Sequence, residues 1–215
     1  MALKPALPAA AALAAILACA CVSPGSPESA PPGSAHAAAA DASKGARIYA
    51  DCAGCHGATA QGTANGQVPA LAGQHYSVIV KQLLDYREGE RWDARMESVM
   101  AEHRFDDDAQ IANVAAYIAG MRMPPAGGGS GIGGEHGATV YAQHCASCHG
   151  PRGEGNGEKV TPRLAGQQYM YLRRQLHDAV DGRRPNMPAD HVALLAPLDV
   201  DDIDGLAEYL AELAI

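Results

Sequence analysis

The feature that most constrains this chain is an internal repeat. Across the 215 residues, a segment around Cys52 aligns without gaps to one around Cys145 at an offset of 93. The aligned pairs include Cys52/Cys145, Cys55/Cys148, His56/His149, Pro69/Pro162, Gly73/Gly166, Gln74/Gln167, Tyr76/Tyr169 and Gln82/Gln175. Because self-similarity at one fixed period marks duplicated structural units, we predict two copies of one domain.

Each copy contains a CxxCH motif, at residues 52–56 and 145–149. Two thiols on one helical turn can add to the vinyl groups of a haem, and the adjacent imidazole can bind its iron. A disulfide or a zinc site is the alternative, but zinc needs four ligands at closer spacing than two pairs 93 residues apart. We therefore expect two covalently attached haem c groups. Their attachment residues and histidine iron ligands are Cys52, Cys55, His56, Cys145, Cys148 and His149.

Large apolar side chains are scarce. The chain has one Phe, one Trp and eight Tyr, which is little for burying the cores of two domains of roughly 80 residues. Haem groups would supply the missing apolar volume. The net charge of -8 leaves no basic surplus to neutralise phosphates, so we expect no nucleic-acid partner.

The end of each repeat shows helical periodicity behind an acidic start. The apolar positions recur at helical spacing after Asp106–Asp108 and after Asp199: Ile111, Val114, Ala115, Ile118, and Ile203, Leu206, Ala207, Leu210. No strand-like alternation of any length is present. The predicted fold class is all-α, with haem domains at residues 43–123 and 137–215 joined by a Gly/Pro-rich linker at 124–136.

The N-terminus is typical of an export signal. Residues 1–18 contain Lys4 and then an apolar run too short for a membrane span. Ile-Leu-Ala-Cys at 16–19 resembles a lipoprotein cleavage site, which predicts lipid attachment at Cys19 and a flexible tether over 19–42. Ordinary cleavage after Ala37 is the alternative. Both place the protein outside the cytoplasm, in the periplasm.

The sixth iron ligand is expected to be methionine, because a thioether binds reduced iron well and raises the potential. In the second copy Met170 falls inside a predicted helix and Met187 in a loop, so Met187 is the expected ligand. The first copy offers Met96 and Met100, and the spacing to flanking repeat residues favours Met96. The other methionine would then pack on the haem edge.

Further polar residues are candidates for secondary roles. Pro69 and Pro162 each lie 13 residues after the ligand histidine, so their carbonyls could accept the Nδ1 proton and leave Nε2 for iron; a simple turn proline is the alternative. Residues that could bond haem propionates, or merely pack, are Tyr76, Tyr169, Arg91 and Arg184. His103 and His191 lie near the methionines.

These motifs resemble the cytochrome c4 family of dihaem class I cytochromes. The resemblance covers about residues 43–215 and includes the paired Pro-x-Leu-Ala-Gly-Gln-x-x-Tyr segments from Pro69 and Pro162. It implies a tandem pair of class I cytochrome c domains, with Met96 and Met187 as iron ligands and haem propionates facing each other across the domain interface. It also implies electron transfer from quinol–cytochrome c reductase to a terminal oxidase.

The expected function is therefore that of an electron carrier and not of an enzyme. A carrier needs six-coordinate irons, whereas a catalytic dihaem protein needs an open or unusually ligated iron. Each haem has a methionine candidate, which favours the carrier. The alternatives are a dihaem oxidoreductase acting on thiosulfate, peroxide or nitrite, and a cytochrome subunit of a dehydrogenase. The acidic net charge predicts docking on a basic patch of the redox partner.

Overall fold

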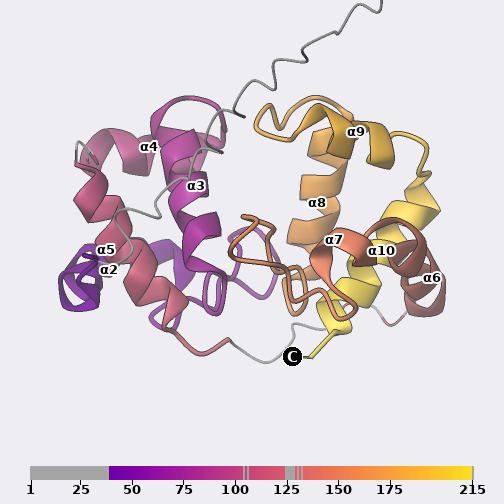
Figure 1. Ribbon diagram of the computed structural model, residues 1–215, viewed down its shortest axis with the longest axis horizontal. Helices are drawn as coiled ribbons and strands as arrows, with labels where there is room; N and C mark the ends of the chain where they lie inside the picture. The colour runs from indigo at the N-terminus through magenta and orange to yellow at the C-terminus, as the bar shows by residue number, and fades with distance from the viewer. Residues whose placement is uncertain are drawn as a thin grey trace, which may run out of the picture.

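The computed structural model describes residues 39–103, 105, 107–123, 129, 131 and 133–214, and these form two helical domains side by side (Figure 1). The first domain contains α2 (Ala42–His56), α3 (Tyr76–Arg87), α4 (Ala94–His103) and α5 (Asp108–Ala119). The second contains α6 (Gly134–His144), α7 (Ala146–His149), α8 (Tyr169–Val180), α9 (Ala189–Leu195) and α10 (Val200–Glu212). Within the described residues the only β-type pairing is one isolated bridge, Asn156 with Thr161. The all-α prediction is confirmed.

The first helix of each domain begins at a local capping feature. Helix α2 begins one residue before position 43, after Asp41, whose carboxylate accepts a hydrogen bond from the Ser43 N–H at 2.9 Å. Helix α6 begins at Gly134, inside the segment predicted as linker, after Gly133 at a φ of 91°. Both helix starts are set by a cap or a left-handed glycine rather than by apolar periodicity.

The predicted signal peptide and most of the predicted tether lie outside the described residues, as does part of the linker. Among the helices that the structure describes, none combines the length and the apolar character needed to cross a bilayer.

The last helix of each domain lies against the first and the middle ones. Helix α5 packs on α2 and α3, and α10 packs on α6 and α8. The eight predicted apolar positions on these two helices are all buried. Asp107 caps α5, and Asp199 and Asp202 form a capping box on α10, so carboxylates satisfy free N–H groups at the positive end of each helix dipole.

Glycine permits the close crossing of the first and last helices. A Cβ atom at Gly45 would collide with the carbonyl oxygen of Asn113, and one at Gly137 would collide with that of Gly205. The same crossings bring together two tyrosine pairs with ring centroids 5.5 Å apart, Tyr49 with Tyr117 and Tyr141 with Tyr209. The Gly and Tyr positions shared by the two repeats are therefore contact positions between helices.

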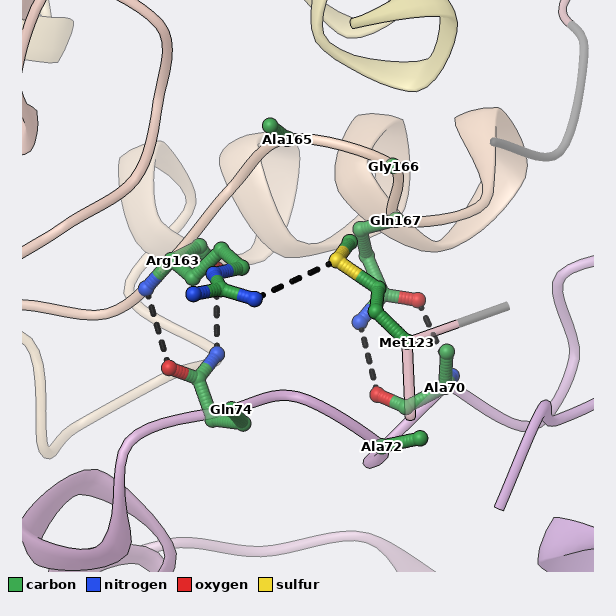
Figure 2. A pocket seen from close by; sticks show the side chains of 8 residues that line it. All are labelled: Ala70, Ala72, Gln74, Met123, Arg163, Ala165, Gly166 and Gln167. Atoms are coloured by element: carbon green, nitrogen blue, oxygen red, sulfur yellow. Dashed lines mark hydrogen bonds between the residues drawn. The ribbon is translucent and has the colours of Figure 1, made fainter. Parts of the chain in front are cut away.

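The two domains meet through equivalent segments of the repeat (Figure 2). The Gln74 Nε2 donates to the Arg163 carbonyl at 3.0 Å, and the Arg163 N–H donates to Gln74 Oε1 at 2.9 Å. Gln167 makes the same two contacts with Ala70, at 2.9 and 3.0 Å. Because Ala70 and Arg163 are equivalent positions of the repeat, the interface has approximate two-fold symmetry.

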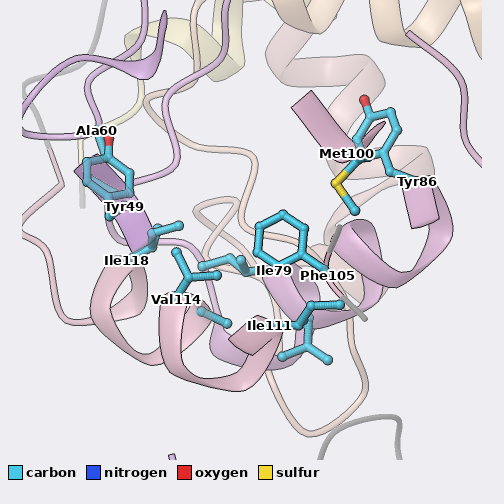
Figure 3. Close-up of a cluster of buried hydrophobic side chains, with 12 residues drawn as sticks. Tyr49, Ala60, Ile79, Tyr86, Met100, Phe105, Ile111, Val114 and Ile118 are labelled. Atoms are coloured by element: carbon cyan, nitrogen blue, oxygen red, sulfur yellow. The ribbon is translucent and has the colours of Figure 1, made fainter. Parts of the chain in front are cut away.

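The described residues of each domain include a cluster of buried apolar side chains. In the first domain it includes Phe105, Ile111 and Met100, which are 4%, 1% and 9% exposed (Figure 3). In the second domain the cluster surrounds Leu206 and Leu210 on α10. The one phenylalanine of the chain thus lies in the first core, and the second is built largely of leucine, alanine and tyrosine.

Candidate haem sites

The two CxxCH motifs occupy the same place in both domains. Residues 52–56 form the last turns of α2, and residues 145–149 run from the end of α6 through α7. A glycine at a φ of 82° follows each histidine, Gly57 and Gly150, so the chain turns away at once. The Tyr49 hydroxyl donates to the Gly57 carbonyl at 2.6 Å, and Tyr141 donates to the Gly150 carbonyl at 2.5 Å. These bonds hold the start of each following loop to its helix.

The four motif cysteines form no disulfide in the structure. Burial raises the pKa of the Cys52 and Cys145 thiols to about 11. A zinc site requires thiolates, and no group of three or more His, Cys, Asp or Glu side chains in the described residues could hold a metal ion. The described residues therefore provide neither a disulfide at these cysteines nor a set of zinc ligands.

The motif histidines are buried and oriented by a backbone carbonyl. His56 and His149 are both 7% exposed. Their Nδ1 atoms lie 3.0 and 2.9 Å from the carbonyl oxygens of Pro69 and Pro162. Because a carbonyl only accepts, Nδ1 carries the proton and Nε2 keeps a free lone pair. Burial lowers the pKa of both histidines, which favours the neutral, metal-binding form.

The methionine candidates lie in different local structures. Met96 and Met100 share α4, a helix that the sequence interpretation did not anticipate although its apolar residues are four apart. Met100 is buried, while Met96 is partly buried against the same cluster. Met187 lies in the turn before α9, half-buried, with its N–H bonded to the Arg184 carbonyl at 3.1 Å. Met170 is 44% exposed on α8, which argues against it as an iron ligand.

One of the two histidines near the methionines lies beside a motif histidine. The His191 ring on α9 is 6.1 Å from the His149 ring, centroid to centroid, and nearly perpendicular to it. Its Nδ1 is buried with no hydrogen-bond partner among the described residues. The His103 side chain lies outside the described part of the structure.

Arg91 and Arg184 come together between the domains. Arg91 donates to the Tyr171 hydroxyl and to Gln175 Oε1, both at 2.8 Å, and both arginines donate to Gln82 Oε1, at 2.6 and 3.5 Å. Burial and the neighbouring Arg91 charge lower the pKa of Arg184 to about 10. Neither guanidinium forms an ion pair with a carboxylate of the described residues. Two buried cations without an ion-paired carboxylate make a favourable environment for an anion.

These features fit haem. Each site offers paired thiols and a neutral buried imidazole with a free Nε2, and the arginines offer positive charge to propionates. The Tyr76 hydroxyl, a propionate candidate, is buried without a partner among the described residues, whereas Tyr169 packs on the second core. Asn186 belongs to the same cluster, since its Nδ2 donates to Gln82 Oε1 at 3.3 Å. Sequence interpretation missed the roles of Tyr171, Gln175 and Asn186, because only the tertiary structure brings them to the first domain.

Comparisons with known proteins agree with this fit. A family model described as cytochrome c matches residues 42–122 and again residues 134–214. A cytochrome c4 from Azotobacter vinelandii is 32% identical over 195 residues, covering 83% of this chain and 91% of the relative. The chain belongs to the cytochrome c4 family. The crystal structure of reduced cytochrome c4 from Pseudomonas stutzeri is also similar, with a TM-score of 0.73 and 27% identity, covering 81% of this chain and 100% of that one.

Membership in the cytochrome c4 family confirms the resemblance seen in the sequence. The protein is a dihaem electron-transfer protein with two covalently bound haem c groups, one in each domain. Another relative, the thiosulfate dehydrogenase electron acceptor of Stutzerimonas stutzeri (strain A1501), is 34% identical, covering 80% of this chain and 87% of the relative.

Proposed function

We propose that this member of the cytochrome c4 family is a periplasmic carrier that takes electrons from quinol–cytochrome c reductase and delivers them to a terminal oxidase or reductase. The observation that carries the proposal is the arginine cluster between the domains, where Arg91 bonds Tyr171 and Gln175 of the other domain. Buried cations shared by both domains support propionates that face each other there. Electrons could then enter at one haem and leave at the other.

We assign His56 and Met96 to the first iron, and His149 and Met187 to the second. The attachment thiols are Cys52 and Cys55, and Cys145 and Cys148. When bound, each haem supplies a one-electron iron couple. The chain's own residues hold it: the Pro69 and Pro162 carbonyls fix the histidine tautomer, and the thioethers favour the reduced state and raise the potential. With both irons six-coordinate, the protein would have no open site for substrate catalysis.

A second candidate is a dedicated electron acceptor for a dehydrogenase. It is favoured by the relative whose name is thiosulfate dehydrogenase electron acceptor. The two candidates share the haem sites and differ only in the protein that supplies the electrons.

The experiment is stopped-flow reduction of the oxidised holoprotein by each donor in turn. Membranes containing quinol–cytochrome c reductase and a quinol should reduce both haems rapidly, and a terminal oxidase should reoxidise them. Slow reduction by the quinol system together with rapid reduction by thiosulfate dehydrogenase and thiosulfate would support the second candidate instead. Rapid carbon monoxide binding to both ferrous haems of the unmutated protein would argue against a carrier and for a catalytic dihaem oxidoreductase.

The proposal includes a lipid anchor at Cys19, which lies outside the described residues and rests on the motif alone. Mass spectrometry of the mature N-terminus tests it. The expected result is a lipid-modified Cys19, and the Cys19→Ser protein should be released from membranes. An unmodified N-terminus after Ala37 would instead indicate a freely diffusing periplasmic carrier.

A further inference from the structure

One peptide group in each domain contacts both a haem-site histidine and a glutamine of the other domain. The peptide between Pro162 and Arg163 accepts from His149 Nδ1 at 2.9 Å, and its N–H donates to Gln74 Oε1 at 2.9 Å. The peptide between Pro69 and Ala70 makes the same contacts with His56 and Gln167, both at 3.0 Å. Figure 2 shows the glutamine half of both connections.

We propose that Gln74 and Gln167 are positioning residues that tune the reduction potential of the haem in the opposite domain through these peptide groups. The inference rests on the proposed function, because it takes His56 and His149 as iron ligands. Each domain would then contribute to the redox properties of its neighbour through hydrogen bonds alone.

The physical basis is polarisation along a chain of hydrogen bonds. A peptide whose N–H donates to a good acceptor carries more negative charge on its carbonyl oxygen, so that carbonyl becomes a better acceptor itself. A better acceptor on Nδ1–H makes the imidazole a stronger electron donor to its metal. Stronger donation stabilises the oxidised iron, so each glutamine should lower the potential of the haem across the interface.

Both glutamine side chains are held in one orientation. Gln74 donates from Nε2 to the Arg163 carbonyl at 3.0 Å while its Oε1 also accepts from the His75 N–H at 3.0 Å. Gln167 likewise donates to the Ala70 carbonyl at 2.9 Å. Because the backbone carbonyl can only accept and the N–H can only donate, the amide oxygen must face the N–H. The acceptor is thus set before any redox event.

The two connections differ in the number of acceptors that reach the peptide N–H. The Ala70 N–H lies 3.0 Å from Gln168 Oε1 as well as from Gln167 Oε1. Among the described residues, Gln74 is the only acceptor for the Arg163 N–H. Loss of Gln74 should therefore affect the second haem more than loss of Gln167 affects the first.

The test is the reduction potential of each haem in the full-length holoprotein, measured by spectroelectrochemistry with the haems distinguished by NMR. Gln74→Leu should raise the potential of the second haem, changing its reduction equilibrium constant by about threefold, and leave the first haem unchanged. Gln167→Leu should raise the first haem's potential by less. Gln74→Glu keeps an oxygen acceptor for the Arg163 N–H and should return the second haem to the unmutated potential or below it.

Ser77→Ala is the matched control. It removes another bond between the domains, from Ser77 Oγ to the Gly157 carbonyl at 2.5 Å, but touches neither peptide group. Its potentials should stay unchanged. The inference is overturned if Gln74→Leu leaves the second haem unchanged, if both haems move equally, or if Ser77→Ala gives the same shift.

Failure of the proposed ligation would look different. His149→Ala should abolish the six-coordinate spectrum of the second haem, and a variant that retained this spectrum would refute His149 as a ligand whatever the glutamine variants do. Failure to exchange electrons with either donor system would refute the proposed carrier role, while the equilibrium potentials would still report on the glutamines.

Discussion

Replacing Gly45 by alanine isolates the helix crossing on which the first domain depends. Gly45 lies on α2 where a Cβ atom would collide with the carbonyl oxygen of Asn113 on α5. A Cβ atom added at Gly54, also on α2, has no atom within 4 Å. The equivalent position of the second repeat is Ser147. Both substitutions change the same residue type in the same helix, and Ser147 shows that the haem motif accommodates a side chain at the position of Gly54.

Two opposing effects set the magnitude at Gly45. Alanine favours helix over glycine by about 1 kcal/mol. The added methyl meets backbone, which no rotamer change relieves, so α2 and α5 must separate by on the order of 1 Å and lose part of their dispersion contacts. Overpacking of this kind costs about 3 kcal/mol. We therefore expect Gly45→Ala to lower the free energy of unfolding of the first domain by about 2 kcal/mol, and Gly54→Ala to leave it unchanged or raise it by about 1 kcal/mol.

Thermal unfolding of the holoprotein, followed by far-ultraviolet circular dichroism and haem absorbance, measures the difference. A loss of about 2 kcal/mol corresponds to a Tm lower by roughly 8–16 °C for a domain of this size. Equal stability of Gly45→Ala and Gly54→Ala would refute the close crossing as the reason for the glycine.

Three further predictions concern the haem ligands, alkaline stability and docking. Because the His191 ring lies beside that of His149, we expect His191 to replace the lost ligand in Met187→Ala. The second haem should then stay low-spin in electron paramagnetic resonance but lose its methionine-to-iron charge-transfer band, and Met187→Ala/His191→Ala should become high-spin. A high-spin Met187→Ala variant would contradict the placement of His191. Burial raises the pKa of Tyr141 from 10.0 to about 12, so the stability that its hydroxyl contributes is complete below the unfolded-state pKa and is lost as the pH rises through the folded-state pKa. In urea unfolding, Tyr141→Phe should therefore lose less stability than the unmutated protein between these two pKa values. Equal losses in the two proteins would contradict this prediction. The net charge of -8 should make electron transfer with a basic partner fall as ionic strength rises, so rates that do not depend on salt would exclude electrostatic docking.

Much of the fold was predictable because its signals are local. The spacing of Ile111, Val114 and Ile118 marks one face of a helix, and all three are buried on α5 as expected. Helix α4 was missed, since its sequence was interpreted through Met96 and Met100 as ligand candidates and not through their helical spacing. The helix starts at Ala42 and Gly134 depend on the capping residues Asp41 and Gly133, which lie outside the apolar pattern.

The sequence alone determined the two haem sites, because covalent attachment requires thiols and an imidazole at fixed short spacing, and the repeat shows that spacing twice. Only the tertiary structure decided how the domains meet. Gln74 and Arg163 are 89 positions apart, and Arg91 and Tyr171 are 80 apart, so no local periodicity indicates their contact. Such pairs follow from how two folded surfaces complement each other, and through them each haem site comes within hydrogen-bonding reach of the other domain.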